Sequence, residues 1–265
     1  MPSRLINKLV ILFSIMITFT LSGCYEPESG CLDLLANNYE VSSDNACKDC
    51  CTYPSFRVEM KHQWNDTTFS FGDTLTNDIG SSFVLLDQKF YLSDWYYTLD
   101  DGTTFRSRDS ILLLLSDNET YVKRDILLVR KNQGSISNHT YRKEGTLKSI
   151  KFVQGIPDQF DDITSSIAEN YSPLSFNNDL YINNTYQSQW LQLGTGANYT
   201  DTIDLYFDED LAFNLESDIN LEKSQDVIIP IYLIYDSLFA EIGFEMSSST
   251  EIRQQIQMNK TNWIK

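Results

Sequence analysis

Cysteine is the residue type whose spacing first suggests chemistry in this chain. Four cysteines lie close together, Cys31, Cys47, Cys50 and Cys51, and no cysteine follows them. Their segment is rich in turn-forming residues and short of apolar ones, so we expect disulfides to hold it together. The pairing stays open among three alternatives, with Cys31 joined to one of the later three. A zinc site of thiolates is the competing interpretation, although adjacent cysteines make awkward co-ligands.

The fifth cysteine, Cys24, predicts a lipid anchor. Two basic residues precede an apolar run from Leu9 to Leu21 that is too short for a membrane span, and the sequence Leu-Ser-Gly-Cys ending at Cys24 has the lipobox pattern. We expect residues 1–23 to be a lipoprotein signal peptide and residues 24–30 to be a tether. Each buried methylene contributes about 0.8 kcal/mol, so several acyl chains hold a domain on a membrane.

The residues after Cys24 set an expectation for location. Tyr25 stands where an aspartate commonly retains lipoproteins in the inner membrane, and Glu26 and Glu28 resemble acidic signals for surface export. We therefore expect the outer membrane, on its periplasmic face or on the cell surface. No later apolar stretch approaches the roughly 18 residues of a spanning helix, so the lipid is expected to be the only contact with the bilayer core.

Composition and missing motifs exclude several classes of function. The formal net charge is −17 at pH 7 and no basic stripe is present, which excludes nucleic acid as a partner. The chain has two histidines and lacks a nucleotide-binding loop, a Ser-His-Asp order and a His-Glu-x-x-His motif, so we expect no enzyme. Acid clusters at Asp158–Asp162 and Asp204–Asp210 are calcium candidates, but without EF-hand spacing we expect solvated loops there.

The elements that carry these residues are mostly strands. Phe56 to Trp64 alternates apolar and polar residues with period two, so one face of this strand is expected to be buried. Pro230 in the last apolar run predicts an edge position or a bulge. The other expected strands are 81–95, 111–115, 126–129, 147–153, 203–207 and 227–235, with a turn at 100–102.

Helical pattern is scarce and is confined to the end of the chain. Residues 247–258 predict one helix, with serines to cap it and Ile252 and Ile256 on one face. The sequence therefore predicts an all-β protein. It should have an antiparallel β-sandwich or barrel-like body, a short C-terminal helix and a small Cys-stapled N-terminal segment.

The order of several motifs adds a resemblance to a known family. The motifs are Phe90-Tyr91-Leu92-Ser93, Asp101-Gly102, the run from Phe152 to Pro157, Ser172-Pro173-Leu174-Ser175, Asp179-Leu180-Tyr181, and a final helix around Gln255 to Trp263. Together they resemble the MbnP-like family over residues 56–263. The cysteine segment is similar to short Gly-Cys-x-Asp-x-x-Ala-x-Asn-Tyr modules of secreted proteins. This divides the mature chain into a Cys-rich module at 31–54 and an MbnP-like β domain at 55–265.

The resemblance implies a periplasmic or surface protein whose characterised relatives bind copper through histidines and an oxidised tryptophan. Carried over to this chain, it points to His62, with Trp64 and Met60 on the same strand face. The chain departs from the family at Ser172, where relatives often have histidine, and at Asn184, where they have tryptophan. The other histidine, His139, is expected in a mobile polar loop.

Two functions follow from these observations. The first is an envelope-anchored, non-enzymatic lipoprotein whose MbnP-like domain binds a ligand, with copper as the implied cofactor, or an envelope protein partner. The second is a metal-free surface interaction or adhesion module. In the second case the cysteine segment is a spacer, His62 is a polar residue on a half-buried strand face, and Trp64 is packed in the core.

Overall fold

The computed structural model describes residues 25–106, 110–115, 118–123, 125–131, 133–157, 160, 172–175, 180–245 and 247–265. The predicted signal peptide and Cys24 lie outside the described residues, as do Asp158, Asp161 and Asp162. The chain divides into two compact units, one ending at Thr52 and the other running from Tyr53 to Lys265. Within the described residues, no helix is long and apolar enough to cross a membrane.

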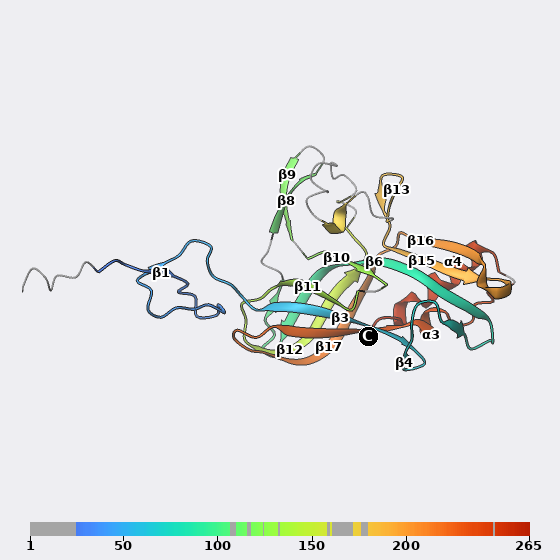
Figure 1. Cartoon of the computed structure of the whole chain (residues 1–265), viewed down its shortest axis with the longest axis horizontal. Coiled ribbons are helices and arrows are strands. Elements are labelled where there is room, and N and C mark those ends of the chain that lie inside the picture. Colours follow the sequence, from blue (N-terminus) through green and yellow to red (C-terminus); the bar gives the residue numbers. More distant parts are fainter. Residues whose placement is uncertain are drawn as a thin grey trace, which may run out of the picture. The chain divides into compact units, whose positions relative to one another are not determined.

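The N-terminal unit is a small loop-rich segment (Figure 1), and two disulfides hold it together. Its two short strands, β1 (Ser29–Gly30) and β2 (Asn45–Ala46), pair in parallel. Disulfides join Cys31 to Cys51 and Cys47 to Cys50. The expectation that Cys31 pairs with a later cysteine is confirmed, and the zinc interpretation is wrong because all four sulfurs are bonded in pairs.

The body of the second unit is built around β6 (Ser82–Leu99), an 18-residue strand. β15 pairs with its first half, from Val84 to Phe90, and β12 pairs with its second half, from Leu92 to Leu99. β16 pairs with β15 and β17 pairs with β12, while β5, β7 and β10 pair with β6. Its members are β5 (Thr74–Thr76), β6, β7 (Thr104–Phe105), β10 (Leu127–Arg130), β12 (Gly145–Gln154), β15 (Gln189–Thr195), β16 (Asp201–Phe207) and β17 (Leu211–Leu221).

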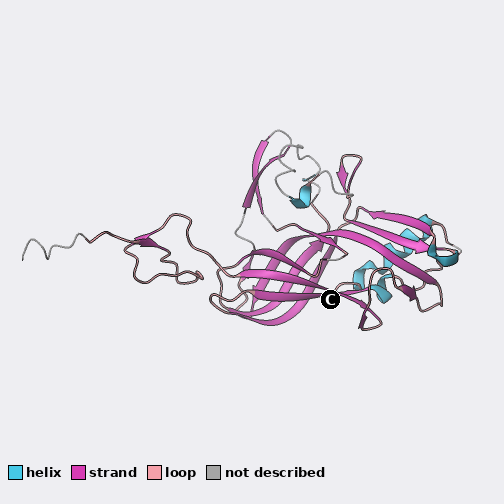
Figure 2. Ribbon diagram, viewed as in Figure 1, coloured by secondary structure: helices cyan, strands magenta, loops and turns pink. Residues whose placement is uncertain are grey.

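A second, four-stranded sheet packs against the first (Figure 2). It contains β3 (Ser55–Trp64), β4 (Thr67–Thr68), β11 (Ser135–Thr140) and β18 (Val227–Ile234). β18 lies at its edge and pairs with β3 in parallel, whereas the other body pairs are antiparallel. The edge position predicted for Pro230 is confirmed, since β3 is the one strand with which β18 forms a ladder.

The described hairpins and helices complete the body. Two hairpins are formed by β8 (Ser110–Leu115) with β9 (Asn118–Lys123) and by β13 (Tyr181–Ile182) with β14 (Thr185–Tyr186). The described helices are η2 (Ser172–Leu174), η3 (Ala197–Tyr199), α3 (Tyr235–Leu238), α4 (Ser249–Asn259) and η4 (Lys260–Asn262). As predicted, α4 begins after a capping serine, Ser248, which forms a capping box with Glu251, and it buries Ile252 and Ile256.

Both faces of the large sheet are buried around the middle of β6. Phe90 and Leu92 point into the main core, which also holds apolar residues of β3, β18 and the C-terminal helices. Tyr91 points to the opposite face, into a second cluster with Leu128 and Trp190. The sandwich, the first of the two predicted architectures, is therefore what this sequence forms, because two apolar sheet faces must cover one another.

The expected loop around His139 was wrong. Residues 135–140 form β11, which pairs with β3, and the His139 side chain is 4% exposed. Its ring packs edge-on against Phe56 and Tyr97. The segment is polar because β11 lies at the edge of its sheet, where the backbone ladder rather than apolar side chains holds it.

Candidate functional site around His62

The His62 side chain lies among aromatic rings at the open end of the small sheet. Phe69 and Phe71, which follow β4, meet the imidazole edge-on at centroid distances of 6.5 and 5.2 Å. The hydroxyl of Tyr235, the first residue of α3, lies 2.8 Å from His62 Nδ1. The segment after β4 and the start of α3 therefore cover His62, which would be more exposed on the strand alone.

The hydrogen bonds select one tautomer of His62. The Tyr235 hydroxyl donates to Oε1 of Gln88 over 2.7 Å, so it accepts the hydrogen of His62 Nδ1. Nε2 then carries a lone pair, and this buried atom has no hydrogen-bond partner. Burial lowers the pKa of His62 to about 4, because desolvation disfavours the imidazolium. The ring is therefore neutral at pH 7.

The two residues predicted to accompany His62 lie on the same strand face. Met60 is 4% exposed and Trp64 is 8% exposed, and both belong to the main core. The edge of Trp64 packs on Phe83. Packing into the core, the second interpretation of these side chains, accounts for their burial.

Histidines, cysteines and acids that could share an ion are scarce in the part of the chain that the structure describes. The sole group of three is Cys47, Cys50 and Cys51, whose sulfurs are disulfide-bonded. His139 is out of reach of His62, because Thr140 pairs with Ser55 at the far end of β3. At about 3.3 Å per residue, the two histidines are roughly 20 Å apart along that strand. One ion cannot contact both imidazoles.

Buried glutamines form a polar chain beside this site, which sequence reasoning missed. Gln154 ends β12 and Gln189 begins β15, so they meet where the two strands adjoin on β6, and Gln154 Nε2 donates to Gln189 Oε1 over 3.0 Å. Trp263 Nε1 donates to Gln154 Oε1 over 3.0 Å, and its ring contacts that of Tyr235. The signal in the sequence was the presence of glutamines within apolar runs.

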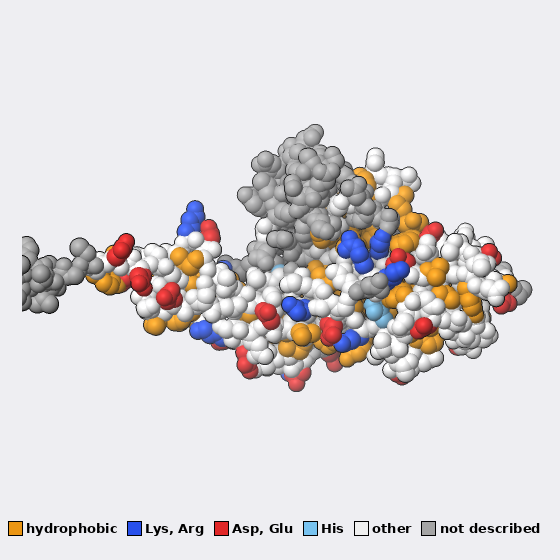
Figure 3. All heavy atoms as spheres, in the orientation of Figure 1, with side chains coloured by type: hydrophobic (Ala, Val, Ile, Leu, Met, Phe, Trp, Pro, Cys, Tyr) orange, Lys and Arg blue, Asp and Glu red, His pale blue; other side chains and the backbone are white. Residues whose placement is uncertain are grey.

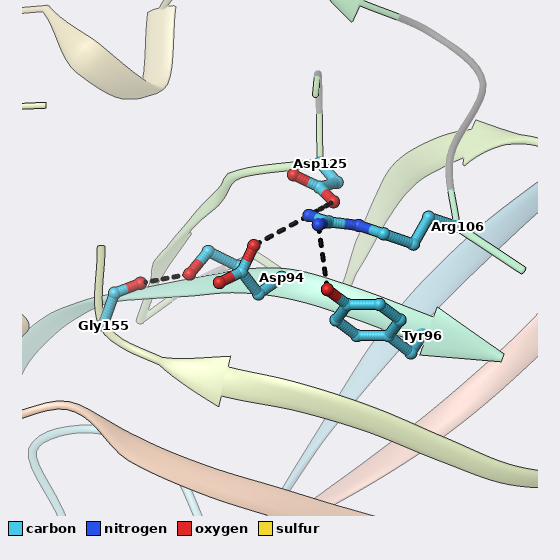
Figure 4. Close-up of polar contacts among 6 residues, drawn as sticks. Asp94, Tyr96, Arg106, Asp125 and Gly155 are labelled. Carbon is cyan, nitrogen blue, oxygen red and sulfur yellow. Dashed lines mark hydrogen bonds and ion pairs between the residues drawn. The ribbon is translucent and has the colours of Figure 1, made fainter. Parts of the chain in front are cut away.

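An ionic cluster lies elsewhere on β6 (Figure 4). Nη2 of Arg106 lies 2.7 Å from Asp94 Oδ1 and 3.0 Å from Asp125 Oδ2, and Nη1 donates to the Tyr96 hydroxyl over 3.0 Å. Asp94 has a positive φ of 52°. Figure 4 shows Arg106 pointing between the two carboxylates, so the cluster binds the segments before β10 and after β7 to β6. The paired charges make it a structural clamp.

The acidic run at 204–210, a calcium candidate in the sequence, forms hydrogen bonds and an ion pair within the protein. Asp204 lies in β16 and accepts hydrogen bonds from Trp190 and Gln192, and Asp208 pairs with Arg253 at 2.9 Å. Asp210 accepts from the Ser188 hydroxyl. Asp204 is exposed but lies in a strand, so the expected solvated loop is confined to residues 208–210, which are exposed between β16 and β17. On the face drawn in Figure 3, the described charged side chains of both signs are scattered among polar ones.

The two residues that depart from the family's copper-binding pattern, Ser172 and Asn184, lie in different segments of the chain. Ser172 begins η2, and Asn184 lies in the turn between β13 and β14 with a positive φ of 65°. Leu174 of η2 belongs to the second cluster, on the face of β6 away from His62. The residues that replace the family's histidine and tryptophan thus lie outside the surroundings of His62.

Fold and site together define a β-sandwich protein with a partly buried, neutral histidine between aromatic rings. The MbnP family model matches residues 53–189, which are 137 of the 265 residues. The chain belongs to the MbnP family. Among solved structures it is similar to MbnP from Methylosinus trichosporium, at 11% identity and a TM-score of 0.41, over 72% of this chain and 78% of that chain. No curated protein sequence matches it.

Proposed function

We propose that this chain is an envelope-anchored, non-enzymatic lipoprotein whose MbnP body binds a ligand or a partner protein without a multi-imidazole copper centre. The observation that carries the proposal is the separation of the two histidines. His62 and His139 occupy different aromatic surroundings at opposite ends of β3. A copper centre with several imidazoles needs them on one ion.

The donors around His62 therefore do not fit the copper centre that the family implies. Within the described residues no second histidine, cysteine or acid joins His62 in a group of three. The copper-binding alternative keeps one observation in its favour, which is the unpartnered lone pair of His62 Nε2 on a ring that is neutral at pH 7. Met60 and Trp64 are its neighbours on that strand face.

Metal analysis of the purified full chain tests the proposal. After incubation with micromolar copper and removal of free metal, we expect less than one copper per chain, equal in the wild type and in the variants His62→Ala and His139→Ala. His139→Ala is the matched control, because it removes the other buried imidazole. Stoichiometric copper that is lost only in His62→Ala would replace this proposal by the copper-binding one.

The anchor is supported by the Leu-Ser-Gly-Cys pattern that ends at Cys24 and is tested separately. Mass spectrometry of the mature N-terminus should find a diacylated Cys24, and cell fractionation should find the protein with the outer membrane. A Cys24→Ala variant should lose both the lipid and the membrane fraction. A mature chain that begins elsewhere and carries no lipid would refute the anchor.

The proposal that this chain is not an enzyme is supported by the contacts of its acidic side chains. Asp94 and Asp125 are paired with Arg106, Asp208 is paired with Arg253, and Asp204 accepts from the Trp190 indole, so these carboxylates are engaged in structural contacts. A protein of this kind acts by binding.

A further inference from the structure

A cavity of about 360 Å³ lies at the end of β3, beyond His62. Two turns and a helix surround it, namely the turn between β3 and β4, the turn between β5 and β6, and α3 with the residues after it. Both α3 and β4 contact β3. The residues that line the cavity are Trp64, Asn65, Thr76, Asn77, Asp78, Asp236, Ser237 and Ala240.

Hydrogen bonds between the loops hold the walls in place. The Asn77 amide donates to the carbonyls of Phe239 and Ile242 over 3.0 and 2.8 Å. Asp78 Oδ1 accepts from the Glu241 amide at 2.8 Å, and Asp236 Oδ1 accepts from the Asn65 amide at 3.2 Å. The cavity is therefore formed before any ligand arrives, which lowers the entropic cost of binding.

The polar atoms of the walls present both acceptors and a donor. Asp78 and Asp236 each use Oδ1 for a backbone amide, and no described residue bonds to their Oδ2 atoms. Trp64 is 8% exposed, and its indole N–H has no acceptor among the described residues. This N–H is not one of the fully enclosed unpaired atoms. It is therefore open to solvent, on a residue that lines the cavity.

These groups specify the chemistry of a ligand. The carboxylate oxygens require donors, and the indole N–H requires an acceptor, so an ammonium group would satisfy only the first. Two carboxylates repel an anion. A hydroxyl group both donates and accepts, and the indole ring adds an apolar surface for carbon-bound hydrogens. The volume lies near the lower end of the roughly 300–1,000 Å³ range of small-molecule sites.

We propose that this cavity binds a neutral polyhydroxylated ligand of the size of one sugar ring, with Asp78 and Asp236 accepting from its hydroxyls and Trp64 donating to one. The proposal rests on the ligand-binding function and names its ligand class. Both carboxylates brace a loop through Oδ1 and belong to residues that line the cavity.

The test uses the detergent-purified full chain and four probes, glucose, galactose, mannose and N-acetylglucosamine. We expect saturation-transfer NMR to detect at least one of them at millimolar concentration. Trp64→Phe removes the donor, and Asp78→Asn weakens an acceptor, so each should weaken binding by roughly tenfold. Trp190→Phe is the matched control, since Trp190 is also 8% exposed but its N–H is bonded to Asp204, and it should bind as the wild type does.

Failure of this proposal is distinct from failure of the proposed function. No signal from any of the four sugars, or equal binding by the wild type and both cavity variants, would overturn the cavity assignment. Binding of calcium or of tetramethylammonium in place of sugars, abolished by Asp78→Asn, would overturn it too. Copper content and Cys24 lipidation, measured on the same preparation, would decide the function independently.

Discussion

The hydroxyl of Tyr235 lies 2.8 Å from Nδ1 of His62, although 173 residues separate the two in the chain. The Tyr235 side chain is fully buried, and its hydroxyl donates onward to Gln88. This contact fixes the orientation of the imidazole and leaves Nε2 as the one unpaired acceptor of the ring. Burial between Phe69, Phe71 and Tyr235 also sets how the protein responds to acid.

Acid should destabilise the body through His62. Its pKa is about 4 when folded and 6.5 when unfolded, so the unfolded chain takes up a proton first as the pH falls. The free energy of unfolding is unaffected by this group above pH 6.5 and falls between pH 6.5 and 4, by on the order of 2–3 kcal/mol. Denaturant titrations of the wild type and His62→Gln at pH 7, 5.5 and 4.5 measure it.

In that experiment His62→Gln should lose stability less steeply than the wild type. Lys61→Gln is the control, because Lys61 lies next to His62 in β3, and its side chain is 42% exposed and paired with Glu59. Its acid response should follow that of the wild type. Equal slopes for all three proteins would show that the burial of His62 has no energetic effect in acid.

Lys260 should destabilise the folded protein at neutral pH. Its side chain is fully buried, and its ammonium lies 4.0 Å from the centre of the Phe207 ring without a hydrogen-bond partner among the described residues. Burial lowers its pKa to about 7, while Glu209, Asp208 and Asp210 raise it and Arg253 lowers it. The unfolded lysine keeps its proton to about pH 10.5, so stability should rise between pH 7 and 10.5.

Lys260→Met should therefore raise the free energy of unfolding at pH 7 by about 2–4 kcal/mol and flatten its rise toward pH 10. Chemical denaturation across this range measures both effects. The exposed Lys151→Met on β12 is the control and should change neither quantity by more than about 0.5 kcal/mol. A destabilised Lys260→Met protein would mean that the contact with Phe207 outweighs the cost of burial.

The Arg106 clamp should tolerate loss of both charges better than loss of one. Asp125 is 3% exposed, and desolvation raises the pKa of its carboxyl against the influence of Arg106. Arg106→Met leaves this carboxylate buried and unpaired, which should cost about 3 kcal/mol. Adding Asp125→Asn should recover part of that loss. The measurement is a double-mutant cycle: the free energies of unfolding of the wild type, Arg106→Met, Asp125→Asn and the double variant are compared.

The exposed pair of Lys148 and Asp218 provides the comparison for the clamp. Their side chains are 50% and 82% exposed, so Lys148→Met should cost much less than Arg106→Met. If Arg106→Met costs as little as Lys148→Met, Asp125 is solvated in solution and the clamp makes no contribution.

Reduction of the disulfides should affect the N-terminal unit alone. The Cys31–Cys51 bond closes a loop with a sequence separation of 20, which should stabilise that unit by about 3 kcal/mol. The second unit contains no cysteine. Hydrogen exchange with and without reductant should therefore speed up in residues 25–52 and stay unchanged in β6, β12 and β15. A Cys31→Ser/Cys51→Ser variant should reproduce the effect without reductant.

The strands that the sequence predicted are those with an unbroken apolar or alternating pattern, such as β3, β6, β12 and β18. β17 was missed because its buried residues are sparse and its ladder with β12 is a backbone interaction. β15 was missed because it begins with Gln189 and Gln192 interrupts its apolar run. Gln189 is fully buried all the same, since its carbonyl oxygen accepts from Gln154.

The candidate site could be predicted only in part. Strand periodicity placed Met60, His62 and Trp64 on one face, and that placement follows from local geometry. The surroundings of His62 come from Phe71 and Tyr235, whose approach depends on long-range packing that no local pattern encodes. For the same reason the burial of His139 in β11 could not be seen in a polar segment.

The parallel pairing of β3 with β18 constrains the order in which the body folds. β3 is the first strand of the body and occupies the interior of its sheet, while its partner β18 is contributed about 170 residues later, since Phe56 faces Val227. A chain emerging from its N-terminus can pair β3 with β4 and β11, but the other edge of β3 stays without its partner until nearly all of the body is available. Such a topology delays completion of the fold and would make the nascent body a client for chaperones that shield exposed strand edges.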